Sequence, residues 1–108
     1  MSRAPKAGRR RAKAKPGHYL LRLFVVGDGP NSKLAEFNLR SLCREHLDGR
    51  CTIETIDVEK NLAAALENNI LITPALVLMD PLPRVTVLGN LSDRHKVLLA
   101  LRLWDGDS

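Results

Sequence analysis

The apolar side chains of the first regular stretch of the chain run almost without a break. Between His18 and Gly27 every side chain except Arg22 is apolar. A run of this length that is apolar on both faces is typical of a central strand with other elements packed on each side. The pattern therefore predicts a first strand over residues 18–27.

An amphipathic helix is predicted next, after a turn. Residues 27–32 (Gly-Asp-Gly-Pro-Asn-Ser) are dense in turn formers, and Asn31 or Ser32 can cap a helix by accepting a bond from its free amide groups. We expect the helix over residues 32–48, with Gly49 as a left-handed stop. Its apolar positions recur at helical intervals and are Ala35, Leu39, Leu42, Cys43 and Leu47.

A second strand is predicted over residues 52–58, which are rich in β-branched side chains. Its polar side chains fall on both faces, which favours a position near a sheet edge. A strand, a helix and a strand joined by connections of this length imply a right-handed parallel βαβ unit.

The second half of the chain carries shorter patterns. Residues 62–68 suit a short helix and residues 75–79 a buried strand. The turn formers of residues 80–83 then lead into a strand over residues 84–88. We expect the two strands to pair as a hairpin.

A last helix is predicted after Ser92, which can cap it, and it extends through the segment 99–102. Its apolar stripe consists of Val97, Leu98, Leu101 and Trp104. The fold class is then α/β with the order βαβαββα. That order, with a Thr73-Pro74 step before the third strand, is the layout of the thioredoxin fold, in which the corresponding proline is usually cis.

The net charge of +5 changes the picture only at the N-terminus. Residues 1–17 hold seven basic and no acidic side chains, whereas residues 18–108 hold ten basic and twelve acidic ones. Residues 1–17 have no periodic apolar position, so we expect a disordered basic tail followed by one domain over residues 18–108. No aromatic residue interleaves the charges, which argues against nucleic-acid binding. No apolar run is long enough for a membrane span or a secretory signal, so we expect a cytoplasmic protein without membrane attachment.

The residues that would carry catalysis are missing from their usual places. Thioredoxin-like enzymes place a nucleophilic cysteine at the turn before the first helix, and residues 27–32 contain none. Cys43 and Cys51 match neither a redox pair nor a metal cluster, and we expect both to be reduced thiols in ordinary packing. His18, His46 and His95 are the three histidines, and no companion at ligand spacing accompanies any of them. We therefore expect no enzyme activity, no cofactor and no metal; the alternative is a redox enzyme with a degenerate motif.

Several short motifs in this order and spacing resemble the KaiB family. They are residues 23–27, 29–32, 56–58 with 60–61, 70–74, 89–94 and 96–98. The resemblance implies a non-enzymatic clock protein that binds the N-terminal ATPase ring of KaiC, where it competes with a histidine kinase bearing a related thioredoxin-like domain. It also implies fold switching between the βαβαββα form and a tetramer-forming ground state of order βαββααβ, and hence self-association into a dimer or tetramer. A stress or signalling adaptor outside any clock stays open as another alternative.

Two departures from the family pattern bear on this switch. The family usually places Gly and Asp in the segment that this chain writes with Ala100 and Arg102. In a last helix, Ala is better than Gly by about 1 kcal/mol, and Arg near the C-terminus is better than Asp by roughly 0.3–1 kcal/mol. Together with the Thr73-Pro74 step, these residues are predicted to set the balance, which should favour the βαβαββα form; neutral drift is the alternative.

The candidate partner-binding residues fall in three places. Thr52 and Glu54 lie on the predicted edge strand. Leu34, Phe37 and Asn69 stand where the family often has basic residues, so the partner surface is expected to differ here. For Leu34 and Phe37 two outcomes are open: an exposed apolar contact, or simple packing in the interior.

Overall fold

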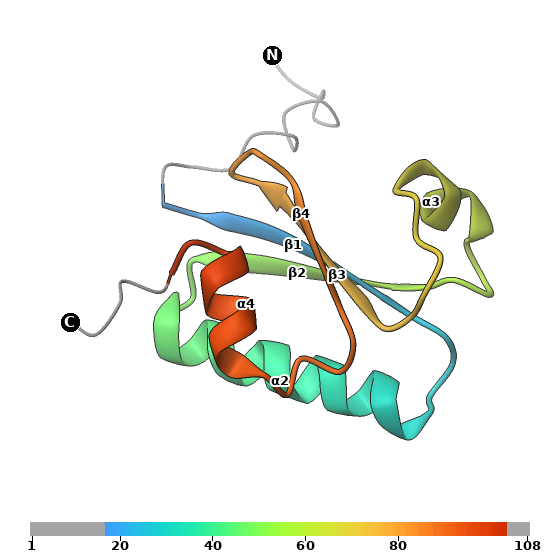
Figure 1. Cartoon of the computed structure of the whole chain (residues 1–108), viewed down its shortest axis with the longest axis horizontal. Coiled ribbons are helices and arrows are strands. Elements are labelled where there is room, and N and C mark those ends of the chain that lie inside the picture. The colour runs from blue at the N-terminus through green and yellow to red at the C-terminus, as the bar shows by residue number, and fades with distance from the viewer. Residues whose placement is uncertain (1–16, 104–108) are drawn as a thin grey trace, which may run out of the picture.

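The computed structural model describes residues 17–103, and the predicted tail therefore lies, except for Gly17, outside the described residues, as does Trp104. The predicted order βαβαββα is confirmed (Figure 1). Strand ends differ from the predicted ones by one or two residues. The elements are β1 (Tyr19–Val25), α2 (Pro30–His46), β2 (Cys51–Asp57), α3 (Leu62–Glu67), β3 (Ala75–Asp80), β4 (Val85–Leu88) and α4 (Arg94–Ala100).

The four strands form one mixed sheet in the order β2-β1-β3-β4. β1 pairs with β2 in parallel, with Tyr19 opposite Cys51, so the predicted parallel unit is confirmed. β1 also pairs with β3 in antiparallel fashion, and β3 and β4 form the predicted hairpin. β2 and β4 are therefore the edges of the sheet, and β1 is central, as its continuous apolar run predicted.

The two faces of the sheet are covered unequally. α2 and α4 lie together on one face, whereas α3 lies on the other, near one end of the strands (Figure 1). The larger core contains Leu21, Leu23, Val25, Leu39, Leu76, Leu78 and Leu98. The smaller core, beneath α3, contains Phe24, Ala65, Ile70, Ala75 and Val77. Alternate residues of β1 and β3 face opposite cores, as the period of a strand requires.

The first helix begins two residues before the predicted start. α2 starts at Pro30, Gly29 is its N-cap, and no side chain caps it, so the prediction that Asn31 or Ser32 is the cap was wrong. Proline is favoured at the first helical position because its φ is already helical and its missing N–H would be unpaired there. The Ser32 hydroxyl instead donates to the Val26 carbonyl at 3.3 Å. The helix ends at His46, and Gly49 has the left-handed conformation expected of it.

The last helix is shorter than predicted at both ends. Its cap is Asp93, whose carboxylate accepts a bond from the Lys96 amide at 3.2 Å, so the prediction of Ser92 was wrong. At the other end α4 stops at Ala100. The Arg102 amide donates to the Leu99 carbonyl and the Leu103 amide to the Leu98 carbonyl. This pair of bonds is a Schellman ending, which requires a left-handed residue at its centre.

Arg102 is that left-handed residue, with φ of 60°. The prediction that it lies in the last helix and suits the helix dipole was therefore wrong. A left-handed backbone costs a residue with a side chain roughly 1–2 kcal/mol, which is why glycine is common at this position. The exposed Arg102 guanidinium donates to the carbonyls of Pro81 and Leu82, at 3.2 and 3.4 Å, and so ties the end of α4 to the β3–β4 turn.

Candidate functional site

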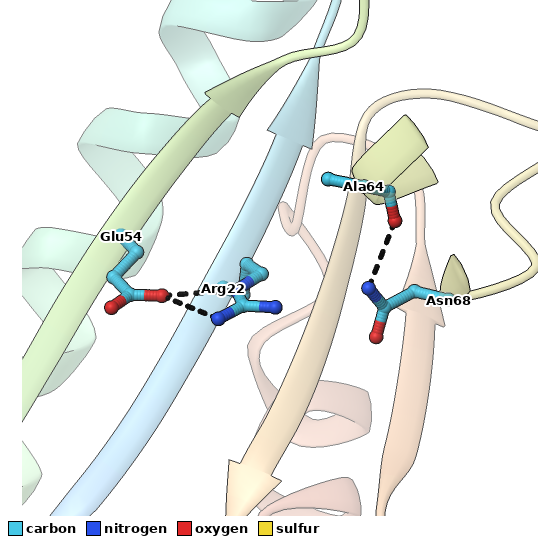
Figure 2. Close-up of polar contacts among 4 residues, drawn as sticks. All are labelled: Arg22, Glu54, Ala64 and Asn68. Carbon is cyan, nitrogen blue, oxygen red and sulfur yellow. Dashed lines mark hydrogen bonds and ion pairs between the residues drawn. The ribbon is translucent and has the colours of Figure 1, made fainter. Parts of the chain in front are cut away.

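The edge strand β2 carries the first two candidate residues. Thr52 is exposed, and its hydroxyl oxygen lies 3.0 Å from Nε2 of His18. Glu54 points toward Arg22 of the neighbouring strand β1, as Figure 2 shows, and the two side chains form an ion pair at 2.9 Å. Both side chains keep part of their surface in water, at 25% for Arg22 and 36% for Glu54. The Glu54 carboxylate is thus already neutralised within the sheet, and Thr52 is the more open of the two residues.

Leu34 and Phe37 lie on the outer side of α2, away from the buried stripe. Phe37 is 64% exposed and Leu34 41%. The alternative that they pack in the interior is therefore wrong, and together they form what we call the α2 patch. An exposed phenylalanine and leucine one turn apart offer apolar surface that a partner can bury.

Asn69 lies in a groove that the sequence did not reveal. Its backbone is left-handed, with φ of 57°, and it follows the C-cap Asn68, whose side chain donates to the Ala64 carbonyl at 2.9 Å (Figure 2). The α3 groove, with a volume of about 410 Å³, is lined by Asn68, Asn69, Leu71, Ile72, Thr86 and Leu88. Leu71 is 91% exposed. The lining of the groove comes from the C-cap of α3, the α3–β3 loop and β4, so only the fold brings these residues together.

Thr73 and Pro74 connect this groove to β3. The peptide bond between them is cis, as is usual for the thioredoxin layout. Thr73 is half-buried and Pro74 is buried. The Pro74 carbonyl accepts a bond from the Gly89 amide at 2.9 Å, which extends the β3–β4 pairing by one contact. The step is thus built into the sheet, and no contact given by the structure links it to Ala100 or Arg102.

The three groups of partner-binding candidates do not form one continuous site. Thr52 and Glu54 lie on β2, the α2 patch on the outer side of a helix that packs on one face of the sheet, and Asn69 beside α3 on the other face. A partner would contact β2 together with one of the other two, or each surface would meet a different molecule.

The turn between β1 and α2, where a thioredoxin-like enzyme holds its nucleophile, has no thiol. A shallow depression of about 170 Å³ lies at this turn, and Asp28, Ser32, Lys33 and Asp57 are among its lining residues. Within residues 17–103 no group of three or more His, Cys, Asp or Glu side chains is placed to hold a metal ion. Over the same residues, no helix has the length and apolar character needed to cross a membrane.

The two cysteines lie together at the opposite end of α2. Cys43 is buried and Cys51 half-buried, and both are free thiols, as expected. Both residues line the same surface cavity. Burial, and then hydrogen bonding to Cys51, raise the pKa of the Cys43 thiol well above its usual range. The sequence spacing did not predict this contact, although one signal was present: Cys43 lies on the buried stripe and Cys51 opens the next strand after a short connection.

Comparison with known proteins gives a consistent result. The family model described as the KaiB domain matches residues 22–103. The circadian clock oscillator protein KaiB of Synechococcus elongatus is 42% identical over 89 residues, which are 82% of this chain and 87% of that protein. The protein of the same name from Microcystis aeruginosa is 42% identical over 85 residues, or 79% of this chain and 82% of that one.

Solved structures share the fold at lower identity. The N-terminal domain of Synechococcus elongatus SasA matches with a TM-score of 0.69 and 21% identity, covering 100% of this chain and 99% of that one. Mitochondrial thioredoxin 3 from Saccharomyces cerevisiae matches with a TM-score of 0.68 and 16% identity, covering 91% and 89%. At these identities the structures establish a thioredoxin-like fold and nothing beyond it.

Proposed function

The chain belongs to the KaiB family, and on that premise we propose that it is a non-enzymatic clock or signalling protein that docks on a KaiC-type ATPase. Docking on the N-terminal ring of that ATPase modulates its ATPase and phosphorylation cycle, and it takes place in the cytoplasm. The observation that carries the proposal is the match to the KaiB domain over residues 22–103. The turn before α2 contains no cysteine nucleophile, which is in keeping with a binding role.

Edge strand β2 and the α2 patch are the surfaces we assign to docking. An edge strand offers unpaired backbone N–H and C=O groups to a partner. Thr52 is exposed on this edge, and Phe37 offers the larger apolar contact of the α2 patch. Aromatic side chains are the most frequent energetic anchors of protein interfaces, so Phe37 is our choice of anchor. Asn69 and the α3 groove form a second contact that depends on the arrangement of the second half of the chain.

Fold switching is part of the same proposal. The second half of the chain exchanges between the βαβαββα arrangement and a βαββααβ arrangement that forms dimers or tetramers. Ala100, the last residue of α4, supports the first arrangement because alanine prefers a helix over glycine by about 1 kcal/mol. Thr73 and Pro74 lie where β3 begins and are the hinge that we assign to the exchange.

Size-exclusion chromatography with light scattering tests the proposal. The purified protein is run alone and then with a KaiC-type ATPase and ATP, and we expect a free monomer that co-elutes with the ring. Phe37→Ala should weaken ring binding by about tenfold, equivalent to 1.4 kcal/mol. Leu99→Ala is the matched control, because Leu99 is 58% exposed on a different helix. Equal binding by wild type and Phe37→Ala would exclude the α2 patch from the docking surface. A free tetramer would contradict the prediction that the βαβαββα form is favoured. The absence of any complex would favour the adaptor outside a clock.

A thioredoxin-like redox enzyme is the remaining alternative class, and it can be separated by a simple assay. Insulin reduction in the presence of a dithiol is measured for the wild type and for Cys43→Ser and Cys51→Ser. We expect no activity above background in any of the three proteins. Activity that disappears in the variants would overturn the non-enzymatic assignment.

A further inference from the structure

Cys43 and Cys51 lie together where α2 ends and β2 begins, at one end of the proposed docking edge. Cys43 belongs to the end of α2, and Cys51 is the first residue of β2. Both line a surface cavity of about 240 Å³, whose other walls are Arg40, Arg44, Gly49 and Ile53. Two thiols thus line one cavity that opens to solvent.

The two sulfur atoms differ in access to solvent. Cys43 is 4% exposed and packs in the larger core, whereas Cys51 is half-buried at its margin. A small molecule that enters the cavity therefore reaches Cys51 first. Cys43 lines the same cavity and belongs to the core cluster against which Cys51 packs. This is the arrangement of an attacked thiol and a resolving thiol.

Two arginines at the mouth of the cavity add to this arrangement. Arg40 and Arg44 are exposed residues of α2 and line the same cavity as both thiols. Arg40 also forms an ion pair with Glu36 at 3.0 Å, and its charge offsets only a small part of the effect of burial on the pKa of the Cys43 thiol. No acidic side chain is among the lining residues of the cavity.

We propose that Cys43 and Cys51 are a peroxide-sensitive dithiol that hydrogen peroxide converts to an intramolecular disulfide. In the first step the Cys51 thiolate attacks one peroxide oxygen; an S–O bond forms, the O–O bond breaks, and hydroxide leaves. In the second step Cys43 Sγ, losing its proton, attacks Cys51 Sγ; the S–S bond forms, the S–O bond breaks, and the departing hydroxide takes up a proton. Two thiols and one peroxide thus give one disulfide and two waters, with two electrons passing from sulfur to oxygen.

The disulfide would fasten the end of α2 to the start of β2. It closes a short loop over residues 43–51, which removes chain entropy from the unfolded state. We expect the midpoint of thermal unfolding to rise by about 10 °C on oxidation and to return on reduction. Because Cys51 opens β2 and Thr52 follows it directly, the modification lies at the start of the proposed docking edge.

Thiol counting on the native wild-type protein tests the proposal and does not depend on ring binding. The protein is treated with hydrogen peroxide, quenched with catalase and analysed by thiol titration and by peptide mapping without reductant. We expect both thiols to disappear together and a Cys43–Cys51 cross-linked peptide to appear, with dithiothreitol restoring both. Two remaining thiols, oxidation of Cys51 without a cross-link, or cross-links only between two chains would each overturn the proposal.

Single variants separate the two roles. In Cys43→Ala, Cys51 should stop at the sulfenic acid, which dimedone traps. In Cys51→Ser, Cys43 should stay unmodified under the same treatment, because it is buried. Rapid oxidation of Cys43 in the Cys51→Ser variant would contradict the assigned order of attack. Thermal unfolding of both reduced variants serves as the control that they are folded.

Discussion

The first half of the molecule is built from long elements and the second half from short ones. β1 and β2 have seven residues each and α2 has 17, whereas α3, β3, β4 and α4 have six, six, four and seven. Exposed large apolar side chains are also concentrated in the second half, at Leu62, Leu66, Leu71, Ile72, Leu82, Leu88 and Leu99, against Val26, Leu34 and Phe37 in the first. Helices of six or seven residues have no stability of their own in water. The second half is therefore held in place by its contacts with the first.

The β1–β3 pairing and the shared apolar core make most of those contacts, and polar contacts add to them. The Tyr19 hydroxyl donates to the Leu101 carbonyl at 3.0 Å, across the whole length of the domain sequence. Asn38 on α2 donates to the Asn90 carbonyl at 2.9 Å, and Glu45 forms an ion pair with Arg94. The second half is thus held to the first by strand pairing and a common core, and the polar contacts are the part that a single substitution can remove.

The largest effect should come from the core of the first half. Leu39→Ala removes a side chain that is 1% exposed between α2 and the sheet, and should lower the free energy of unfolding by about 2–5 kcal/mol. Urea denaturation measures it. Leu34→Ala, on the exposed side of the same helix, is the matched control and should change stability by less than about 0.5 kcal/mol. Similar losses in the two variants would contradict the assignment of α2 as the scaffold helix.

A smaller loss of stability should follow when the hydrogen bond between β1 and the end of the chain's second half is removed. Tyr19→Phe removes one hydrogen bond to the chain just after α4, and should cost about 1–1.5 kcal/mol. Native-state hydrogen exchange should show faster exchange for the amides of Val97–Ala100 and unchanged protection in β1 and β2. Uniformly faster exchange throughout residues 19–100 would mean that the two halves open as one unit.

The ending of α4 should respond to backbone conformation more than to charge. Both Arg102→Gly and Arg102→Ala lose the bonds to Pro81 and Leu82, but only glycine removes the cost of the left-handed conformation. The glycine variant should therefore be more stable than the alanine variant by about 0.5–1 kcal/mol. Thermal unfolding of the pair measures the difference. If alanine is the more stable, the Schellman ending does not govern this position.

The smallest effect should come from the ion pair within the first half. Glu54→Gln breaks a partly exposed pair with Arg22 and should cost about 0.5 kcal/mol, less in 1 M salt. Glu36→Gln, which breaks the exposed pair with Arg40 on α2, is the control, with a loss of about 0.3–0.5 kcal/mol. A loss above 2 kcal/mol for Glu54→Gln would show that this pair, and not the apolar core, fixes β2 in the sheet.

The sequence predicts the first half better than the second for a physical reason. Over α2 the apolar stripe repeats through several turns, so the helix is predicted correctly even when its predicted ends are off by two residues. At α4 only two turns are available, and its end is decided by Leu98 and Leu103, which close the Schellman bonds while packing in the core. Arg102 then takes a conformation that its own propensity disfavours. Tertiary packing overrides local preference there, and no window of sequence contains that information.

Some features of the candidate sites could be predicted from the sequence, whereas others depend on how separate elements pack. Exposure of Phe37 and Thr52 follows from their position relative to a periodic pattern, so it was open to sequence reasoning. The α3 groove joins residues 68–72 to Thr86 and Leu88, and the thiol pair joins a helix to the next strand. Both exist because of pairing and packing between separate elements. The same limit explains why the ion pair between Glu54 and Arg22, which lie on neighbouring strands, was not predicted.

The strand order also constrains the sequence of events when the protein is synthesised. β1 pairs with β2 at Tyr19 and Cys51, but with β3 at Leu21 and Leu78, a separation along the chain that is nearly twice as long. Closing the longer loop costs about 0.6 kcal/mol more for each doubling of its length. Synthesis delivers β1, α2 and β2 from the ribosome first, and domains begin to form from the N-terminal side. The parallel pair can therefore form on the nascent chain, and β3 and β4 then add to the open side of β1 as they emerge.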